Sequence, residues 1–83
     1  MADAKAIGQF VIGKYITPAR NRGDYVVGVR SGEVHDDMGL HQKLPAVCSV
    51  LGSNTFNRTA KVRRIAVEGP INGASTLFMY RLK

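Results

Sequence analysis

The chain has 83 residues, with twelve Lys and Arg against six Asp and Glu and a formal net charge of +6. This length fits one domain, 1–83, with a thin core, because so short a chain hides only about 60% of its unfolded surface. The charge favours a polyanionic partner, nucleic acid first and acidic membrane second, while the single cysteine, Cys48, excludes an intramolecular disulfide and a Cys-rich zinc site.

The first twenty residues alternate apolar with polar and charged side chains, and lack the continuous apolar stretch of a signal peptide or transmembrane helix. We therefore expect a cytoplasmic protein without membrane contact. Apolar side chains recur at spacings of three and four, which predicts one face of a helix. That face consists of Ile7, Phe10, Val11 and Tyr15. Pro18 predicts the end of this helix at Thr17, and residues 19–24 are expected to form a basic loop.

Residues 25–30 are β-branched and aromatic, which predicts a short strand. Ser31 follows as a candidate N-cap of a second helix, in which Val34 and Met38 lie four residues apart on the buried side. Gly39 predicts the end of that helix, because glycine commonly follows a helix terminus.

A third helix is predicted to begin near Leu44, with Pro45 at a first-turn position that proline tolerates. Its apolar stripe consists of Val47, Val50 and Leu51. Gly52 weakens its last turn, so its end stays open anywhere from Leu51 to Arg58.

Two strand-like segments follow, at residues 62–67 and 75–82. The intervening residues 68–74 contain Gly-Pro and Asn-Gly, both strong turn signals, so the segments should form a hairpin with a loop of about seven residues. Alternate residues of the second strand should share one face and pack on the helices. These are Thr76, Phe78, Tyr80 and Leu82.

The order helix, strand, helix, helix, strand, turn, strand resembles that of the winged helix-turn-helix family. The resemblance covers nearly the whole chain and rests on this order and on the turn at Gly39. It implies an α+β fold and DNA binding. A small α+β domain of another topology, or a three-helix bundle with an incidental hairpin, is the competing interpretation.

In the winged family the second helix of the pair enters the major groove and the hairpin tip contacts the backbone. The resemblance therefore implies that Gln42 reads an adenine edge and that Lys43 contacts guanine or phosphate. The residues implied at the turn and the start of the reading helix are His41, Gln42, Lys43, Ala46 and Ser49, and those implied at the wing are Asn72 and Gly73. Residues 44–53 contain no Arg, Asn or Gln, so binding through phosphates and DNA shape fits better than strong base specificity.

The densest basic run follows that helix and supplies the best candidates for phosphate contacts. Its members are Asn54, Asn57, Arg58, Lys61, Arg63 and Arg64. On a strand Arg63 and Arg64 point to opposite faces, so they are not expected to reach the same DNA, whereas Arg20 and Arg22 would extend the footprint. About five neutralised phosphates predict a slope of log affinity on log salt of about −4 to −5.

The only cluster that suggests catalysis or metal binding has no recognised ligand spacing. It consists of His35, Asp36, Asp37 and His41. We therefore expect no enzyme, no metal site and no cofactor, with both aspartates solvated. Cys48 is expected to be a buried, inert residue at the edge of the core.

Three binding functions remain. The first is a transcription regulator bound to double-stranded DNA, the second a sequence-tolerant architectural protein of the nucleoid, and the third a protein-interaction domain that uses the winged fold without nucleic acid. Charge alone leaves RNA open as the partner. A homodimer would form through Phe10, Val11 and Tyr15 of the first helix, or through the terminal strand ending at Lys83.

Overall fold

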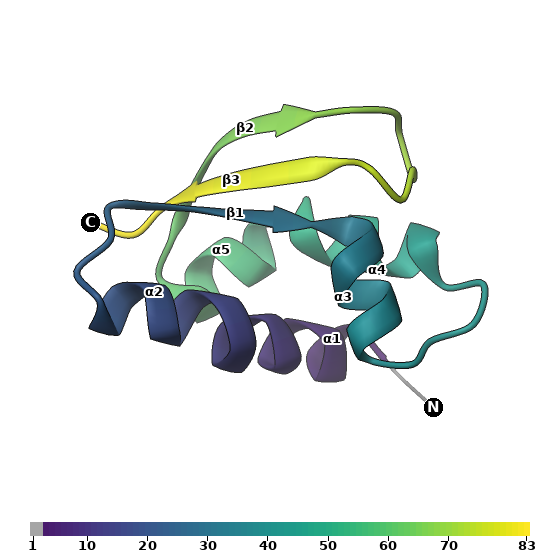
Figure 1. Cartoon of the computed structure of the whole chain (residues 1–83), viewed down its shortest axis with the longest axis horizontal. Coiled ribbons are helices and arrows are strands. Elements are labelled where there is room, and N and C mark those ends of the chain that lie inside the picture. The colour runs from purple at the N-terminus through teal and green to yellow at the C-terminus, as the bar shows by residue number, and fades with distance from the viewer. Residues whose placement is uncertain (1–2) are drawn as a thin grey trace.

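The computed structural model describes residues 3–83, so residues 1 and 2 of the predicted domain lie outside the described part. The fold is α+β, with four helices packed on one face of a three-stranded antiparallel sheet (Figure 1). The first helix is continuous through α1 (Ala4–Val11), the π-helical η1 (Ile12–Ile16) and α2 (Thr17–Asn21). The other helices are α3 (Ser31–Asp37), α4 (Leu44–Leu51) and α5 (Asn54–Ala60). The strands are β1 (Val26–Arg30), β2 (Arg63–Glu68) and β3 (Leu77–Arg81).

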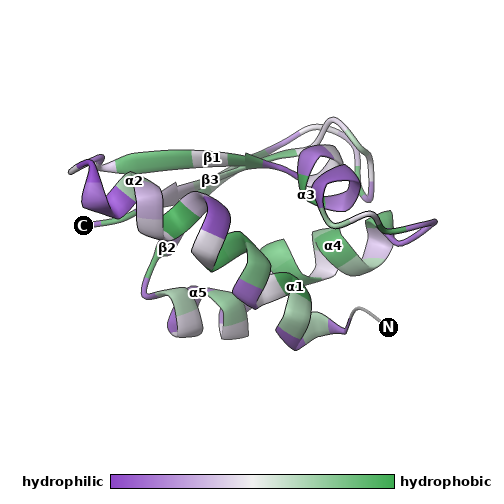
Figure 2. Ribbon diagram, turned by 60° about the horizontal axis from the view of Figure 1, so that its bottom comes forward, coloured by the Kyte–Doolittle hydropathy of each residue, from purple (hydrophilic) through white to green (hydrophobic). Residues whose placement is uncertain are grey.

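Hydrophobic residues dominate β1 and α4, whereas the turn after α2 and the connection between α3 and α4 are hydrophilic (Figure 2). The core lies between the sheet and the helices, and Ile7, Val29 and Leu51 are fully buried in it. Within residues 3–83, none of the helices combines the length and the apolar character needed to cross a bilayer.

The predicted end of the first helix at Thr17 is wrong, because the helix passes through Pro18 and continues to Asn21. Proline has no N–H and its ring clashes with the carbonyl four residues earlier. The π-helical turn of η1 precedes the proline and widens the helix, and the Thr17 N–H donates to the carbonyl of Ile12, five residues back. The predicted basic loop is therefore helical up to Asn21, and Arg20 belongs to α2.

The second helix, α3, ends as predicted at Gly39, whose φ of +67° supplies the left-handed residue of the terminus. The N–H of Gly39 donates to Asp36 O and that of Leu40 to His35 O, the bond pattern of a Schellman motif. The role of Ser31 differs from the prediction. Arg30 is the N-cap, and the buried Ser31 instead donates its hydroxyl to the carbonyl of Gly73 at 2.5 Å.

The third predicted helix begins at Leu44 as expected and ends at Leu51, but a further helix, α5, then follows. Gly52 breaks the chain, and the Ser53 hydroxyl caps α5 by accepting from the N–H of Phe56 at 3.1 Å. The element order therefore contains one helix more than predicted, and it lies between α4 and β2.

The sheet has the strand order β1-β3-β2, with β3 antiparallel to both neighbours. The predicted hairpin is confirmed as β2 and β3, and the loop between them runs from Gly69 to Thr76. The predicted inner face is also confirmed, because all four of its residues are buried. These residues are Thr76, Phe78, Tyr80 and Leu82.

Tyr80 connects the sheet to two helices. Its side chain is fully buried, its hydroxyl donates to the carbonyl of Leu51 at 2.6 Å, and its ring centroid lies 5.4 Å from that of Phe56. Burial raises the pKa of the Tyr80 phenol, so the neutral hydroxyl persists as the donor. One residue of β3 therefore fixes the end of α4 and the inner face of α5.

We expect Tyr80→Phe to lower the free energy of unfolding by about 1–3 kcal/mol, because it leaves the buried Leu51 carbonyl without its donor while retaining the ring. Urea denaturation of both proteins measures the loss. Tyr25→Phe, at a side chain that is 67% exposed, is the matched control and should change stability little. Equal stability of Tyr80→Phe and the unmodified protein would contradict the role of this bond.

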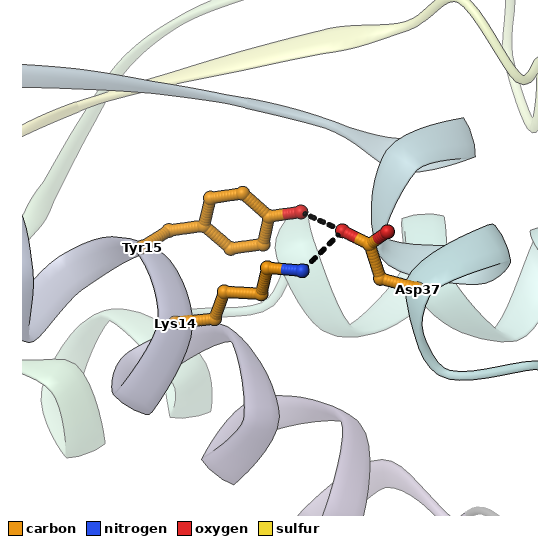
Figure 3. Close-up of polar contacts among 3 residues, drawn as sticks. All are labelled: Lys14, Tyr15 and Asp37. Atoms are coloured by element: carbon orange, nitrogen blue, oxygen red, sulfur yellow. Dashed lines mark hydrogen bonds and ion pairs between the residues drawn. The ribbon is translucent and has the colours of Figure 1, made fainter.

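A polar contact joins the first helix to α3 (Figure 3). Asp37 Oδ2 accepts from Lys14 Nζ at 2.7 Å and from the Tyr15 hydroxyl at 2.9 Å. Burial, followed by the bond to Asp37, raises the pKa of Tyr15 to about 12, and the bonds from Lys14 and Tyr15 lower the pKa of Asp37. Asp36 and Asp37 are both exposed, as expected, but Asp37 also joins the two helices.

The lowered pKa of Asp37 predicts how the stability of the fold changes with pH. Its carboxylate should stabilise the fold above the ordinary value of 3.8, and this contribution should be lost as the pH falls through the lower folded-state value. Asp37→Asn should therefore reduce the free energy of unfolding at neutral pH, with the difference disappearing in acid. Urea denaturation at a series of pH values tests this, with the neighbouring Asp36→Asn as control. A difference that grows on acidification would refute it.

Candidate nucleic-acid interface

The hairpin loop from Gly69 to Thr76 is held on the start of α3. The N–H of Ser31 donates to Thr76 O at 3.0 Å and that of Gly32 to Ala74 O at 2.8 Å. Helix starts leave such N–H groups without helical partners, and here the hairpin supplies the acceptors. The loop therefore has a fixed position beside α3.

Most of the predicted contact residues at this end of the molecule are exposed, but the exposed ones bring little positive charge. They are His41, Gln42, Lys43, Ser49 and Asn72. The backbone N–H of Lys43, the N-cap of α4, donates to His35 Nε2 at 3.0 Å and is not available to a phosphate. Ser49 lines a hollow beside the loop together with Asn72, so these two residues do lie close together.

Most cations gather at the opposite end of the sheet. Arg63 lies opposite Arg81 in the register, and the N–H of Leu82 donates to the carbonyl of Tyr25 at 2.7 Å, so the starts of β1 and β2 meet the end of β3 (Figure 1). Eight of the twelve Lys and Arg residues belong to this end, which we call the basic end. They are Arg20, Arg22, Arg58, Lys61, Arg63, Arg64, Arg81 and Lys83.

The acidic residues are distributed in the opposite way. Within residues 3–83, which contain every Asp and Glu of the chain, Asp24 is the one acidic side chain at the basic end. The other four cations lie among the remaining five acids, of which Glu33 and Glu68 flank the hairpin loop. This segregation concentrates positive potential at one end of a molecule that extends 33 Å along its longest axis.

The eight cations are not equivalent. Arg20 Nη2 donates to the carbonyls of Ala60 and Lys61, and so caps the C-terminus of α5, while Arg22 is paired with Asp24 at 3.0 Å. Arg20 was predicted to extend the DNA contact surface, but its guanidinium is already engaged in capping α5. Arg64 is half-buried on the inner face, opposite Tyr80, and Arg63 points to the outer face, as the sequence predicted.

Three predicted cations remain exposed around the end of α5, and the described residues give their side chains no hydrogen bond or ion pair. These are Arg58, Lys61 and Arg63. Lys61 has a left-handed φ of 57° and ends α5 as its C-cap. The helix end and the strand start fix the backbone positions of these three cations, while their side chains extend into solvent.

Helix α5 presents a polar face that α4 lacks. Phe56 and Ala60 are buried, which turns Asn54 and Arg58, one helical turn apart, toward solvent. Arg and Asn side chains read guanine and adenine edges, whereas the exposed positions of α4 carry Pro45 and Ser49. In the sequence alone, Asn54 and Arg58 are recognisable only as part of a basic run.

Two further exposed residues of α5, Thr55 and Thr59, were missed by the sequence analysis. The Ser53 cap and the four-residue spacing of Phe56 and Ala60 were the signals that could have identified this helix. Both threonines line a groove of about 560 Å³ between α1, α4 and α5, into which Lys5 of α1 also faces. The groove runs along the exposed side of α5.

The chain was compared with protein-family models, curated proteins and solved structures, and none of the three comparisons finds a match.

The position of the hairpin loop depends on Gly32. A Cβ added there would lie 2.5 Å from the carbonyl oxygen of Ala74, too close for either residue to stay in place. Gly32→Ala should therefore lower the free energy of unfolding by about 1–3 kcal/mol. Gly13→Ala, where the added Cβ meets nothing within 4 Å, is the control and should not destabilise the protein. Thermal denaturation compares them, and unchanged stability of Gly32→Ala would contradict this packing.

Proposed function

We propose that the protein binds double-stranded DNA through the basic end and the exposed face of α5. The observation that carries the proposal is the segregation of charge, with eight of twelve cations and one of six acids at one end. Phosphates attract exposed Lys and Arg whatever the base sequence, so Arg58, Lys61 and Arg63 would supply most of the affinity.

The proposal includes a winged-helix arrangement. The sheet order β1-β3-β2 and the hairpin loop beside the α3–α4 pair support it. In this proposal α5, rather than α4, faces the major groove, because α5 carries both the polar residues and the neighbouring cations. The turn and wing residues His41, Gln42, Lys43 and Asn72 then lie outside the principal phosphate-binding surface.

Transcription regulation is the role that the α5 face favours. Asn54 and Arg58 lie one turn apart and could contact neighbouring base pairs, which a regulator needs for an operator. A sequence-tolerant architectural role is the second candidate, supported by the cations Lys61 and Arg63, which lie outside the helix and would contact backbone alone. Either role would place the protein on the nucleoid in the cytoplasm.

Fluorescence anisotropy with two unrelated duplexes, a single strand and an RNA hairpin tests the proposal over a series of salt concentrations. We expect both duplexes to bind more tightly than the single strand and the RNA. Equal affinity for the two duplexes would favour the architectural role, and a selected sequence that binds more tightly would favour regulation. Preference for RNA, or no binding at low salt, would overturn the DNA proposal, the latter in favour of a protein-interaction domain.

The same assay locates the contact surface. Arg58→Ala and Lys61→Ala should each weaken duplex binding and reduce the slope of log affinity on log salt by about 0.9. Lys43→Ala removes the same charge from the turn before α4 and should leave the slope nearly unchanged. The reverse pattern, with Lys43 dominant, would move the interface to the α3–α4 turn and refute the role given to α5.

A further inference from the structure

The two dimer contacts expected from the sequence are both occupied within the chain. Val11 of the first helix is fully buried, and Phe10 and Tyr15 pack against the core. The terminal strand β3 is the central strand of the sheet, with β1 and β2 on its two sides, and has no edge left to pair across an axis. Phe10 and Tyr15 are only partly buried, but β3 offers no free edge, so the edge strands are the better surface for a second copy.

Strand β2 lies at the edge of the sheet and exposes apolar side chains there. Ile65 and Val67 are each 50% exposed, although both belong to a strand. An edge strand presents a row of unpaired backbone N–H and C=O groups, and an edge that also exposes apolar residues is prone to pair with another strand. These properties point to pairing but do not by themselves define the partner.

The charges on β2 define the partner. A register shift between Arg64 and Ala66 makes Ile65 a bulge residue. In the register with β3, Arg63 lies opposite Arg81 and Glu68 lies opposite Leu77. Leu77 and Arg81 are four residues apart on β3 and therefore point to the same face. Arg63 and Glu68 consequently share the outer face of the sheet. Without the bulge, two residues five apart would point to opposite faces. The strand therefore carries a positive end and a negative end on one face.

We propose that β2 pairs antiparallel with β2 of a second copy, about a two-fold axis that passes beside Ala66. Antiparallel pairing then places Arg63 of each copy opposite Glu68 of the other, on the outer face, and the two-fold axis makes this ion pair twice. Arg64 and Val67 of the two copies face each other on the inner side. The result is a continuous six-stranded sheet that removes both β2 edges from solvent.

The other edge of the sheet does not offer this match. Antiparallel self-pairing of β1 would place Arg30 opposite Val26 of the second copy, so neither arginine would lie directly opposite an acid. A bulge commonly discourages edge pairing because it bends and twists the strand. In β2 the bulge also brings Arg63 and Glu68 to the same face, so that each can pair with the opposite charge of a second β2. The bulge lies at the centre of the pairing, away from these ion pairs.

Charge exchange tests the proposal without nucleic acid, so its outcome is independent of the DNA proposal. Light scattering after size exclusion should give twice the monomer mass of 9.0 kDa at high protein concentration. Arg63→Glu and Glu68→Arg should each yield monomers, because like charges then oppose each other, and the double variant should regain the dimer. Lys61→Glu changes the net charge by the same amount as Arg63→Glu, but Lys61 lies outside the strand, so this variant should remain dimeric.

Cross-linking provides a second measurement at the axis. Ala66→Cys should form a covalent dimer on mild oxidation, since Ala66 of the two copies would face each other on the outer side, while the native Cys48 is buried. Ser75→Cys, at an exposed residue of the hairpin loop outside β2, should not cross-link comparably. A monomeric unmodified protein, dimers that survive both single charge reversals, or a double variant that stays monomeric would each overturn the proposal.

Discussion

The contact between Tyr80 and the end of α4 is the constraint on which the rest of the structure depends. A chain of 83 residues has a thin core, and the sheet is covered by helices on one face only. Tyr80 lies on the central strand, so its bond to Leu51 and its packing on Phe56 position both α4 and α5 against all three strands. Because the hydroxyl is buried and neutral, the bond does not compete with water.

The position of α5 decides where the positive charge lies. Phe56 fixes the buried side of this helix, and Arg20 reaches across from α2 to cap its last carbonyls. The cations that follow are therefore carried on an ordered helix terminus and a strand start. The hairpin loop, at the other end of the molecule, is held by its bonds to the start of α3, and those bonds occupy the N–H groups of Ser31 and Gly32. The backbone is held in place at both ends of the molecule, whereas most of the cations lie at one end.

The sequence predicted the elements whose signals are local. Gly39 ended α3, Pro45 began α4, and alternation along β3 identified its buried face, because in each case the residue itself determines the backbone or the side-chain direction. It failed at Pro18, where a π-helical turn earlier in the helix accommodates the proline. It also missed α5, because the segment around Arg58 was interpreted as a basic run and not from the cap at Ser53 and the apolar Phe56. The segregation of charge was not predictable, since it depends on strand order.

The site and the strand edge show the same limit of sequence reasoning. Arg63 and Glu68 are five residues apart, and a regular strand would place them on opposite faces, so their common face exists only because of the bulge against β3. Pairing with Glu68 of a second copy would neutralise Arg63 and leave Arg58 and Lys61 as the main cations facing DNA. Neutralising Glu68 in turn removes an acid that would repel a phosphate backbone. The proposed dimer and the proposed DNA contact are compatible if α5 remains exposed, because the side chains proposed to read bases lie on α5 and not on β2.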